Sequence, residues 1–397
     1  MEYRFSNRIS SLQPSLIREI LKNASGTDII PFSAGNPAPE SFPVADMKRI
    51  ADDIFEHNAS GALQYGITEG YQPLREAVLA RMKTRFSCGA DFDELIVVSG
   101  GQQGIELSCK VLCNEGDTVL CENPSFIGAM NAFRSYGVNL VGVDMEADGI
   151  NVEKLEQALK AEKNVRLLYL IPTFQNPMGV TMTLEKRRAV YALAKKYGVL
   201  IVEDNPYGEL RFEGEDVPTI KSLDTEGLVI YCGSFSKVLS AGIRVGFVLA
   251  PSPVIQKLVV AKQVSDVHTN LFFQMVAHRY MTQCDFEAHL GAIRALYRKK
   301  AALMQEGLQN AFGGRAAFTR PQGGLFLWGT LPENVNMLMF CKNAAAKKVA
   351  VVPGSAFCAS EKDPCNSFRL NYSTPSDAQI VEGCAILGRV FKEMAGA

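Results

Sequence analysis

The sequence has little of what marks exported, membrane-bound or nucleic-acid-binding proteins. Its 397 residues carry 41 basic and 42 acidic side chains, which gives a formal net charge of −1 with no basic stripe or acidic tail. This balance makes nucleic acid and anionic membranes poor partners. The first letters, MEYRFSNRISSLQPS, lack the apolar core of a signal peptide, and no apolar run is long enough to cross a bilayer. We therefore expect a cytoplasmic protein with no membrane or nucleic-acid partner.

Metal and disulfide motifs are also missing. The four histidines are scattered and form no HExxH, and the ten cysteines form no CxxC. Ten cysteines in so long a chain do not resemble a disulfide framework, and buried thiols in a reducing compartment are expected instead. We expect no metal site.

The common nucleotide-binding motifs are absent as well. The segment SGGQQG (99–104) has serine in place of the first glycine of GxGxxG, and no GK dipeptide exists for a Walker A loop. The segment nevertheless follows an expected strand and opens an expected helix. The backbone N–H groups of Gly101 and Gln102 would then face an anion at the sheet edge. An ordinary strand-to-helix turn explains the same letters equally well.

What is present is a regular alternation of short β-rich runs and helical runs from about residue 94 to 251. Such alternation predicts βαβ units and a mainly parallel sheet covered by helices on both faces. One helix has Thr183 as its expected N-cap and Gly198 just beyond its end. The expected fold is α/β, with a three-layer α/β/α large domain.

The C-terminal part changes character. From about residue 286 a long helical pattern leads to short strands and a closing helix, for which Thr374 is the expected N-cap. The N-terminal part has an expected helix near 14–23 and then a Gly/Pro-rich stretch. We expect a smaller α/β domain built from both chain ends. The expected division is an arm and part of the small domain (1–43), the large domain (44–285) and the small C-terminal domain (286–397).

Polar residues follow two of the expected strands. Asp204 ends the apolar run VLIVED, and Tyr207 follows on the next loop; Asn176 lies in PTFQNPMG after another apolar run. Side chains at the carboxyl ends of parallel strands commonly face a ligand. Taken alone, both segments are explained better as turns, because Asp and Asn before proline are common turn formers.

The segment GSFSKVLSAGIRVG (233–246) places Lys237 between serines and an arginine. Lys237 could be a surface lysine, a phosphate ligand, a covalent anchor or the base of a serine acyl hydrolase. Ser234 and Lys237 match the SxxK motif of penicillin-binding enzymes, but the companion motifs SDN and KTG are absent, as is GxSxG.

Six segments occur together in a family order: YGITEGYQPLREAV, ENPSFIGAM, NPMG, DNPYGEL, SFSKVLSAGIRVG and FRLNYS. Together they resemble the fold-type-I pyridoxal-phosphate enzymes, class I/II aminotransferases. The segments SLIREILK and FSAGNPAPESFP are similar to the 2-aminoadipate and kynurenine aminotransferase subgroup. The resemblance covers nearly the whole chain.

The resemblance implies a role for each polar residue around the cofactor pyridoxal 5′-phosphate. Lys237 would bond to the cofactor aldehyde and later act as general base, and Asp204 would keep the pyridine nitrogen protonated. Tyr207 and Asn176 would hydrogen-bond the cofactor O3′. The phosphate would be bound by a set that combines hydroxyls, a guanidinium and backbone N–H groups: Ser234, Ser236, Arg244, Gly101 and Gln102.

The remaining implied residues concern substrate and subunit contacts. Phe126 would stack on the cofactor ring, where relatives often have Tyr or Trp, and Arg369 would bind the substrate α-carboxylate, with Gly35 beside it. Arg18 would meet a distal carboxylate, although a solvated helix-face arginine is the simpler interpretation. Tyr65 would reach the phosphate of the neighbouring subunit, which implies a homodimer with shared active sites.

The implied reaction moves an amino group from an L-amino acid to a 2-oxo acid, with 2-oxoglutarate as the acceptor and ping-pong kinetics. A C–S β-lyase on the same fold is the alternative. A serine acyl hydrolase is more remote. A ligand-sensing regulator would need a DNA-binding head, and here the family-like region starts almost at residue 1.

Overall fold

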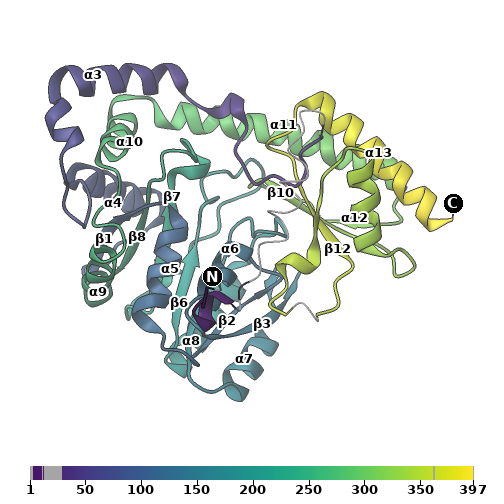
Figure 1. Ribbon diagram of the computed structural model, residues 1–397, viewed down its shortest axis with the longest axis horizontal. Coiled ribbons are helices and arrows are strands. Elements are labelled where there is room, and N and C mark those ends of the chain that lie inside the picture. The colour runs from purple at the N-terminus through teal and green to yellow at the C-terminus, as the bar shows by residue number, and fades with distance from the viewer. Residues whose placement is uncertain (1–2, 11, 13–28, 361–362, 397) are drawn as a thin grey trace.

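The computed structural model describes residues 3–10, 12, 29–360 and 363–396. Figure 1 shows a larger α/β unit beside a smaller one that contains the C-terminus. The helix expected near residues 14–23 lies outside the described residues, as does Arg18. Among the helices that are described, none combines the length and apolar character of a membrane span.

The large unit is built on an eight-stranded sheet in the order β1-β8-β7-β6-β5-β2-β3-β4. Its strands are β1 (Asp93–Val98), β2 (Thr118–Asn123), β3 (Asn139–Glu146), β4 (Gly149–Ile150), β5 (Val165–Leu170), β6 (Leu200–Asp204), β7 (Val229–Ser234) and β8 (Gly246–Pro251). Strands β3, β2, β5, β6 and β7 pair in parallel. Strand β8 is antiparallel to both of its neighbours, so β1 again runs in the direction of β7. The sheet is therefore mainly parallel, as predicted.

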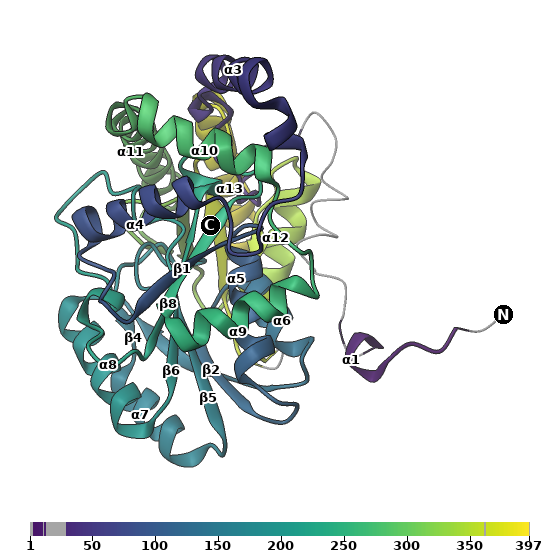
Figure 2. The same ribbon diagram turned by 90° about the vertical axis from the view of Figure 1, so that its left-hand side faces the viewer.

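Helices cover both faces of this sheet, which gives the predicted three layers (Figure 2). Alternate residues of a strand point to opposite faces. Leu168 thus packs in the core beneath α7 (Val152–Ala161) and α8 (Leu184–Tyr197). Tyr169 points the other way, into the core that contains residues of α5 (Gly101–Leu112), α6 (Ile127–Arg134) and α9 (Ser252–Gln263).

The predicted ends of α8 are confirmed. The side chain of Thr183 accepts a hydrogen bond from the backbone N–H of Lys186. At the other end Gly198 adopts the left-handed conformation with φ 66°, where a Cβ would be strained. Local sequence signals therefore set both ends of this helix.

The small unit has a four-stranded antiparallel sheet in the order β11-β12-β10-β9. Its strands are β9 (Ala317–Phe318), β10 (Phe326–Thr330), β11 (Val352–Pro353) and β12 (Ser367–Asn371), and its helices are α11 (Phe286–Phe312), α12 (Met337–Ala346) and α13 (Asp377–Ala395). The N-terminal segment joins this unit through a parallel bridge between Ile30 and Val349.

The expected cap of the closing helix was wrong. Helix α13 begins at Asp377, and its N-cap is Ser376 rather than Thr374. The hydroxyl of Ser376 accepts from the N–H of Gln379, whose side chain in turn accepts from the N–H of Ser376. This reciprocal capping box satisfies two helix-end N–H groups, which Thr374 two residues earlier could not do. Thr374 instead donates to the carbonyl of Asn36.

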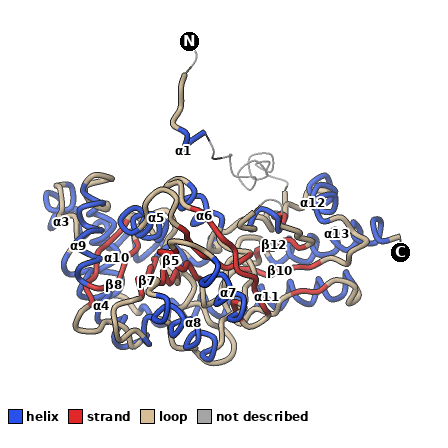
Figure 3. Tube along the Cα trace, turned by 90° about the horizontal axis from the view of Figure 1, so that it is seen from below, coloured by secondary structure: helices blue, strands red, loops and turns tan. Residues whose placement is uncertain are grey.

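The remaining helices lie at the edge of the large unit and beyond it. They are α1 (Asn7–Ser10), α3 (Val44–Leu63), α4 (Gln72–Phe86) and α10 (Leu271–Gln283). Helix α3 packs against α10. The segment that carries α1 extends away from the two sheets (Figure 3). The domain boundaries after residues 43 and 285 remain a prediction.

Candidate active site

A cavity with about 990 Å³ of empty space opens where the strands of the large sheet end. Strands β1, β2, β5, β6 and β7 point the same way, so their carboxyl ends meet at one edge. Twelve of the fourteen predicted site residues line this cavity: Gly35, Gly101, Gln102, Phe126, Asn176, Asp204, Tyr207, Ser234, Ser236, Lys237, Arg244 and Arg369. Of the other two, Tyr65 is 79% exposed and does not line it, and Arg18 lies outside the described residues.

Lys237 ends a short 3-10 helix (Phe235–Lys237) that follows β7 directly. Its Nζ donates to the carbonyl of Gly35 at 2.7 Å. Burial, and then the positive charges of Arg369 and Arg244, lower the pKa of Lys237 to about 8, while Asp204 opposes this. An amine with this pKa is substantially uncharged slightly above neutral pH, as a nucleophile or general base requires.

Asp204 ends β6 at the floor of the cavity and is 5% exposed. Burial raises the pKa of its carboxyl to about 7, although the hydroxyl of Tyr169 donates to Oδ2 at 2.8 Å. Sequence reasoning missed Tyr169. It lies on β5 inside an apolar run, and the only available signal was that a buried tyrosine hydroxyl needs a polar partner.

Arg244 precedes β8, and because β8 runs back along β7 its first residues lie at the same edge as Lys237. The backbone of Arg244 is left-handed, with φ 54°. Its guanidinium donates to the carbonyl of Ser99 at 3.1 Å and to Oγ of Ser236 at 3.4 Å. A Cβ on Gly100 would stand 2.3 Å from Nη2, so the glycine makes room for this arginine.

The N-terminus of α5 completes this end of the cavity. Gly101 and Gln102 are its first residues, so their N–H groups have no partner within the helix. Ser234 Oγ accepts from the N–H of Ser236 at 3.1 Å. Free N–H groups, two hydroxyls and a guanidinium together suit a phosphate dianion.

Arg369 reaches the cavity from β12 of the small sheet and is 5% exposed. Its guanidinium lies over the rings of Phe326 and Phe357, at 4.3 and 4.9 Å from their centres. Nη2 donates to the carbonyls of residues 33 and 34, while Nε is buried without a partner. Burial lowers the pKa of Arg369 to about 10, so it remains a cation at neutral pH. These two aromatic contacts were not predicted, because they form only when the small unit folds.

Asn176 links the two units. Its Oδ1 accepts from Nη1 of Arg369 at 2.9 Å, and its side chain also hydrogen-bonds Tyr207. Asn176 follows β5 and Tyr207 follows β6, which are neighbouring strands. The turn signals found in the sequence are therefore real, and these turns also carry site residues.

The ring of Phe126 lies beside the N-terminus of α5. Phe126 is the N-cap residue of α6, and a Cβ on Gly128 would stand 2.4 Å from its ring. The side chain of Gln102 donates to the carbonyl of Gly128 at 2.9 Å. Gly128 therefore lets an aromatic ring pack closely at the cavity wall.

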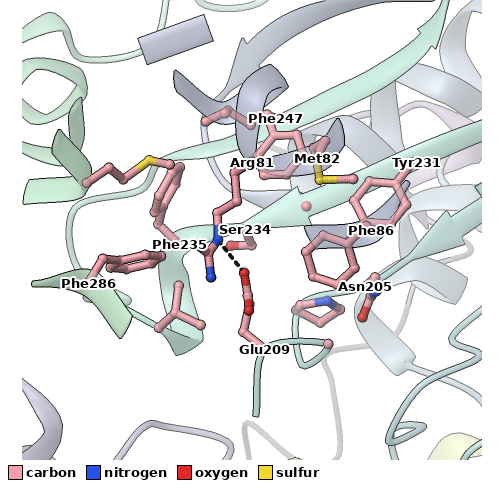
Figure 4. Close-up of a pocket in the computed structure, with 16 residues that line it drawn as sticks. Arg81, Met82, Phe86, Asn205, Glu209, Tyr231, Ser234, Phe235, Phe247 and Phe286 are labelled. Atoms are coloured by element: carbon pink, nitrogen blue, oxygen red, sulfur yellow. Dashed lines mark hydrogen bonds and ion pairs between the residues drawn. The ribbon is translucent and has the colours of Figure 1, made fainter. Parts of the chain in front are cut away.

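A second cavity, with about 480 Å³ of empty space, is lined by Ser234 and Phe235 at the end of β7 (Figure 4). It is lined mainly by apolar side chains, including Phe235 and Val238, and by the ion pair between Arg81 and Glu209. Nε of Arg81 donates to Glu209 at 2.6 Å. Neither Lys237 nor Asp204 lines this cavity, although Ser234 and Pro206 line both cavities.

The SxxK interpretation finds no support in the contacts. Lys237 donates to Gly35, and the hydroxyl of Ser234 is bonded to the N–H of Ser236. A hydrolase of this type would need the lysine to deprotonate the serine.

The residues of the large cavity fit pyridoxal phosphate. The donor set supplies an anion site at α5, a carboxylate at the end of β6 and a lysine amine between them. The unpartnered Nε of Arg369 and the open space beside Gly101, where a Cβ would meet its nearest atoms at 3.7 Å or more, leave room for a ligand. Among the residues that the structure describes, no group of His, Cys, Asp and Glu could hold a metal ion.

Comparisons with known proteins agree. The family model for aminotransferases of class I and II matches residues 27–387. The chain is 40% identical to aromatic-amino-acid aminotransferase 1 of Thermococcus litoralis, over 99% of this chain and 95% of that protein. Kynurenine aminotransferase from Pyrococcus horikoshii, solved with PMP, is 38% identical over 98% of this chain and 97% of its own, with a TM-score of 0.94.

A further solved structure is alpha-aminoadipate aminotransferase from Thermus thermophilus, complexed with N-(5′-phosphopyridoxyl)-L-leucine. It is 38% identical over 99% of this chain and 98% of its own, with a TM-score of 0.91. The predicted fold type, subgroup and cofactor are confirmed. The chain belongs to the class I and II aminotransferases, enzymes that transfer amino groups with pyridoxal 5′-phosphate as cofactor.

Proposed function

We propose that this aminotransferase takes the amino group of an L-amino acid with an aromatic or 2-aminoadipate-like side chain and passes it to 2-oxoglutarate in two half-reactions. The observation that carries the proposal is the convergence of Lys237, Asp204 and Arg369 on one cavity. An amine with a pKa near 8, a buried carboxylate and a buried guanidinium are the three groups that such a transfer needs from the protein.

Each of these residues has a separate task. The bound cofactor supplies an electron sink for the charge that develops at the substrate Cα. Arg369 binds the substrate α-carboxylate and so orients the Cα–H bond toward Lys237, whose Nζ accepts the proton. Asp204 is the anionic partner of the pyridine nitrogen, and Asn176 and Tyr207 hydrogen-bond O3′. Arg244, Ser234, Ser236 and the N-terminus of α5 hold the phosphate.

The amino-donor class follows from the apolar wall of the cavity. Ile105, Phe126, Ile127, Ile171 and Phe326 line it together with the polar residues. An aromatic or long methylene side chain buries apolar surface there. The names of the relatives, which include aromatic, kynurenine and aminoadipate aminotransferases, support the same class.

A half-reaction experiment tests the proposal. The purified, pyridoxal-phosphate-loaded enzyme is mixed with one amino acid and no acceptor, and its visible absorption is followed. We expect the yellow band to disappear with stoichiometric release of one oxo acid per site, and to return when 2-oxoglutarate is added. Continuous pyruvate release from cystathionine without an acceptor would instead identify a lyase. Lys237→Ala should abolish the half-reaction, and Asp204→Ala should slow it severely.

We also propose a homodimer in which Tyr65 completes the site of the partner subunit. In one chain Tyr65 is exposed, and it follows a helix whose exposed apolar side chains include Val44, Phe55 and Leu63. Large apolar side chains exposed along one element are consistent with an interface. Mixing inactive Tyr65→Ala and Lys237→Ala proteins tests this, because a hybrid dimer with shared sites has one intact site. Random exchange should restore about a quarter of the wild-type activity. No restoration, with subunit exchange verified by mass, would contradict the shared site.

The predicted cytoplasmic location is likewise a proposal. All ten cysteines are free thiols in the structure. Free thiols persist in reducing compartments, which supports this location.

A further inference from the structure

Glu122 is a buried carboxyl group that the reaction outlined above does not use. It lies near the end of β2, one residue before Asn123, and its exposed fraction is 0%. Its Oε2 accepts from the backbone N–H of Ile171 at 3.0 Å and from Nε2 of Gln175 at 3.2 Å. The carboxyl group of one strand is therefore tied to the segment that follows the neighbouring strand β5.

Both the nitrogen and the oxygen of the Gln175 side-chain amide form hydrogen bonds near Glu122. Besides Glu122, its Nε2 donates to the carbonyl of Pro124 at 2.8 Å, and its Oε1 accepts from the N–H of Met178 at 2.9 Å. The side chain is 1% exposed. Buried amides with all partners in place fix their surroundings, because every alternative position leaves a polar group unpaired.

The two segments joined in this way carry cavity residues. Asn176 is the next residue after Gln175, and Phe126 comes two residues after Pro124. Ile171, whose N–H is bonded by Glu122, lines the cavity itself. We refer to the bonds from Glu122 to Ile171 and Gln175, and from Gln175 to Pro124, as the Glu122 clasp.

The other oxygen of Glu122 is where the carboxyl group can carry a proton. Oε1 is buried and has no hydrogen-bond partner. Burial raises the pKa of this carboxyl to about 7, against the lowering effect of its two hydrogen bonds. A proton on Oε1 leaves Oε2 as the acceptor of both bonds and removes a negative charge from the wall beside Asp204.

We propose that Glu122 is a positioning residue of the active site: through the clasp it fixes the distance between Phe126 and Asn176 across the cavity, without touching substrate or cofactor. The inference rests on the roles proposed above for Phe126 and Asn176. This positioning role depends on the acceptor oxygen of residue 122 rather than on its charge. Glu122→Gln therefore keeps the role, and Glu122→Ala loses it.

Glu203 provides a matched control on β6, which is separated from β2 by β5. It is also 0% exposed, and its carboxylate accepts from the N–H groups of Ile220 and Lys221 at 3.0 and 2.7 Å. These partners do not line the cavity. Glu203→Ala therefore removes an equally buried carboxyl group with two similar bonds, but leaves the clasp intact.

The experiment compares Glu122→Ala, Glu122→Gln and Glu203→Ala in the loaded enzyme and after cofactor removal. Hydrogen exchange is measured for peptides that contain Ile171 and Met178, together with the dissociation constant for pyridoxal phosphate, KM and kcat. In Glu122→Ala we expect these amides to exchange about tenfold faster or more, and cofactor binding and kcat/KM to fall about tenfold or more. Glu122→Gln should stay within about twofold of wild type. Glu203→Ala should speed exchange only around Ile220.

Three results would overturn the proposal. These are unchanged exchange and kinetics in Glu122→Ala, equal damage to the cavity in Glu203→Ala, and a Glu122→Gln variant as impaired as Glu122→Ala. If Glu122→Ala does not fold, Gln175→Met removes the two clasp bonds of Gln175 and leaves the bond to Ile171, so we expect faster exchange at Met178 than at Ile171, together with weaker cofactor binding. A wild-type protein that binds no pyridoxal phosphate would refute the proposed function, whereas the exchange data would still decide the clasp.

Discussion

Asp204→Asn is expected to stabilise the cofactor-free protein while it weakens the loaded enzyme. Burial raises the pKa of Asp204 from 3.8 to about 7 in the folded protein. This difference corresponds to about 4 kcal/mol of unfolding free energy. The folded-state pKa is higher than the unfolded-state pKa. The free energy of unfolding is therefore not reduced by Asp204 below pH 4, and it falls as the pH rises toward 7. An asparagine does not titrate, so it avoids this loss.

The assay is urea unfolding of both cofactor-free proteins between pH 4 and 8.5. We expect the advantage of Asp204→Asn to be about 2 kcal/mol at pH 5 and about 4 kcal/mol at pH 8, with no further gain above pH 8. Asp52→Asn, at an exposed carboxylate paired with Lys48, serves as the control with a small effect. With pyridoxal phosphate the order should reverse, since the variant lacks the anion for the pyridine nitrogen. An advantage that does not depend on pH would refute the reasoning.

Three further outcomes are expected. Tyr169→Phe removes the hydroxyl that donates to Asp204, so it should raise the pKa of that carboxyl and weaken pyridoxal phosphate binding about tenfold or more in equilibrium dialysis; unchanged affinity would argue against the role of Asp204. The rate at which cofactor-free protein captures pyridoxal phosphate should rise as the pH passes about 8, where Lys237 loses its proton. Arg369→Leu should move this rise to higher pH, because it removes a positive charge that lowers the pKa of Lys237. A rise at the same pH would contradict this effect of Arg369 on Lys237. Ser376→Ala should lower the free energy of unfolding by about 1 kcal/mol in denaturant titrations, because it breaks the capping box. A cost near zero would contradict the assignment of Ser376 as the N-cap.

The sequence sufficed for features that depend on local patterns and on strand direction. Taken alone, the segments of Asp204 and Asn176 are explained as turns, and it was the family resemblance of six ordered segments that implied a shared site; both residues line the same cavity. Thr183 and Gly198 needed only local patterns, because a cap depends on a few adjacent residues. Local rules failed at Thr374, where a better capping box exists two residues later.

Contacts between distant segments could not be read from the sequence. Tyr169 and Glu122 look like ordinary members of buried strands, and their partners become visible only when the strands lie side by side. The role of Tyr65 depends on a second subunit, because within one chain it is exposed and does not line the cavity. In each case the missing information is which segment packs against which.

The position of Arg369 has a consequence for how the chain folds. Its guanidinium bonds to Asn176, 193 residues away in the sequence, and to the carbonyl of Ser33, 336 residues away. Contacts over such separations form late, because closing long loops costs entropy before any contact stabilises them. The proposed carboxylate-binding site at Arg369 is therefore complete only when both ends of the chain have met its middle. During refolding, the ability to bind an amino acid would mark the completion of the native topology, later than the formation of either sheet alone.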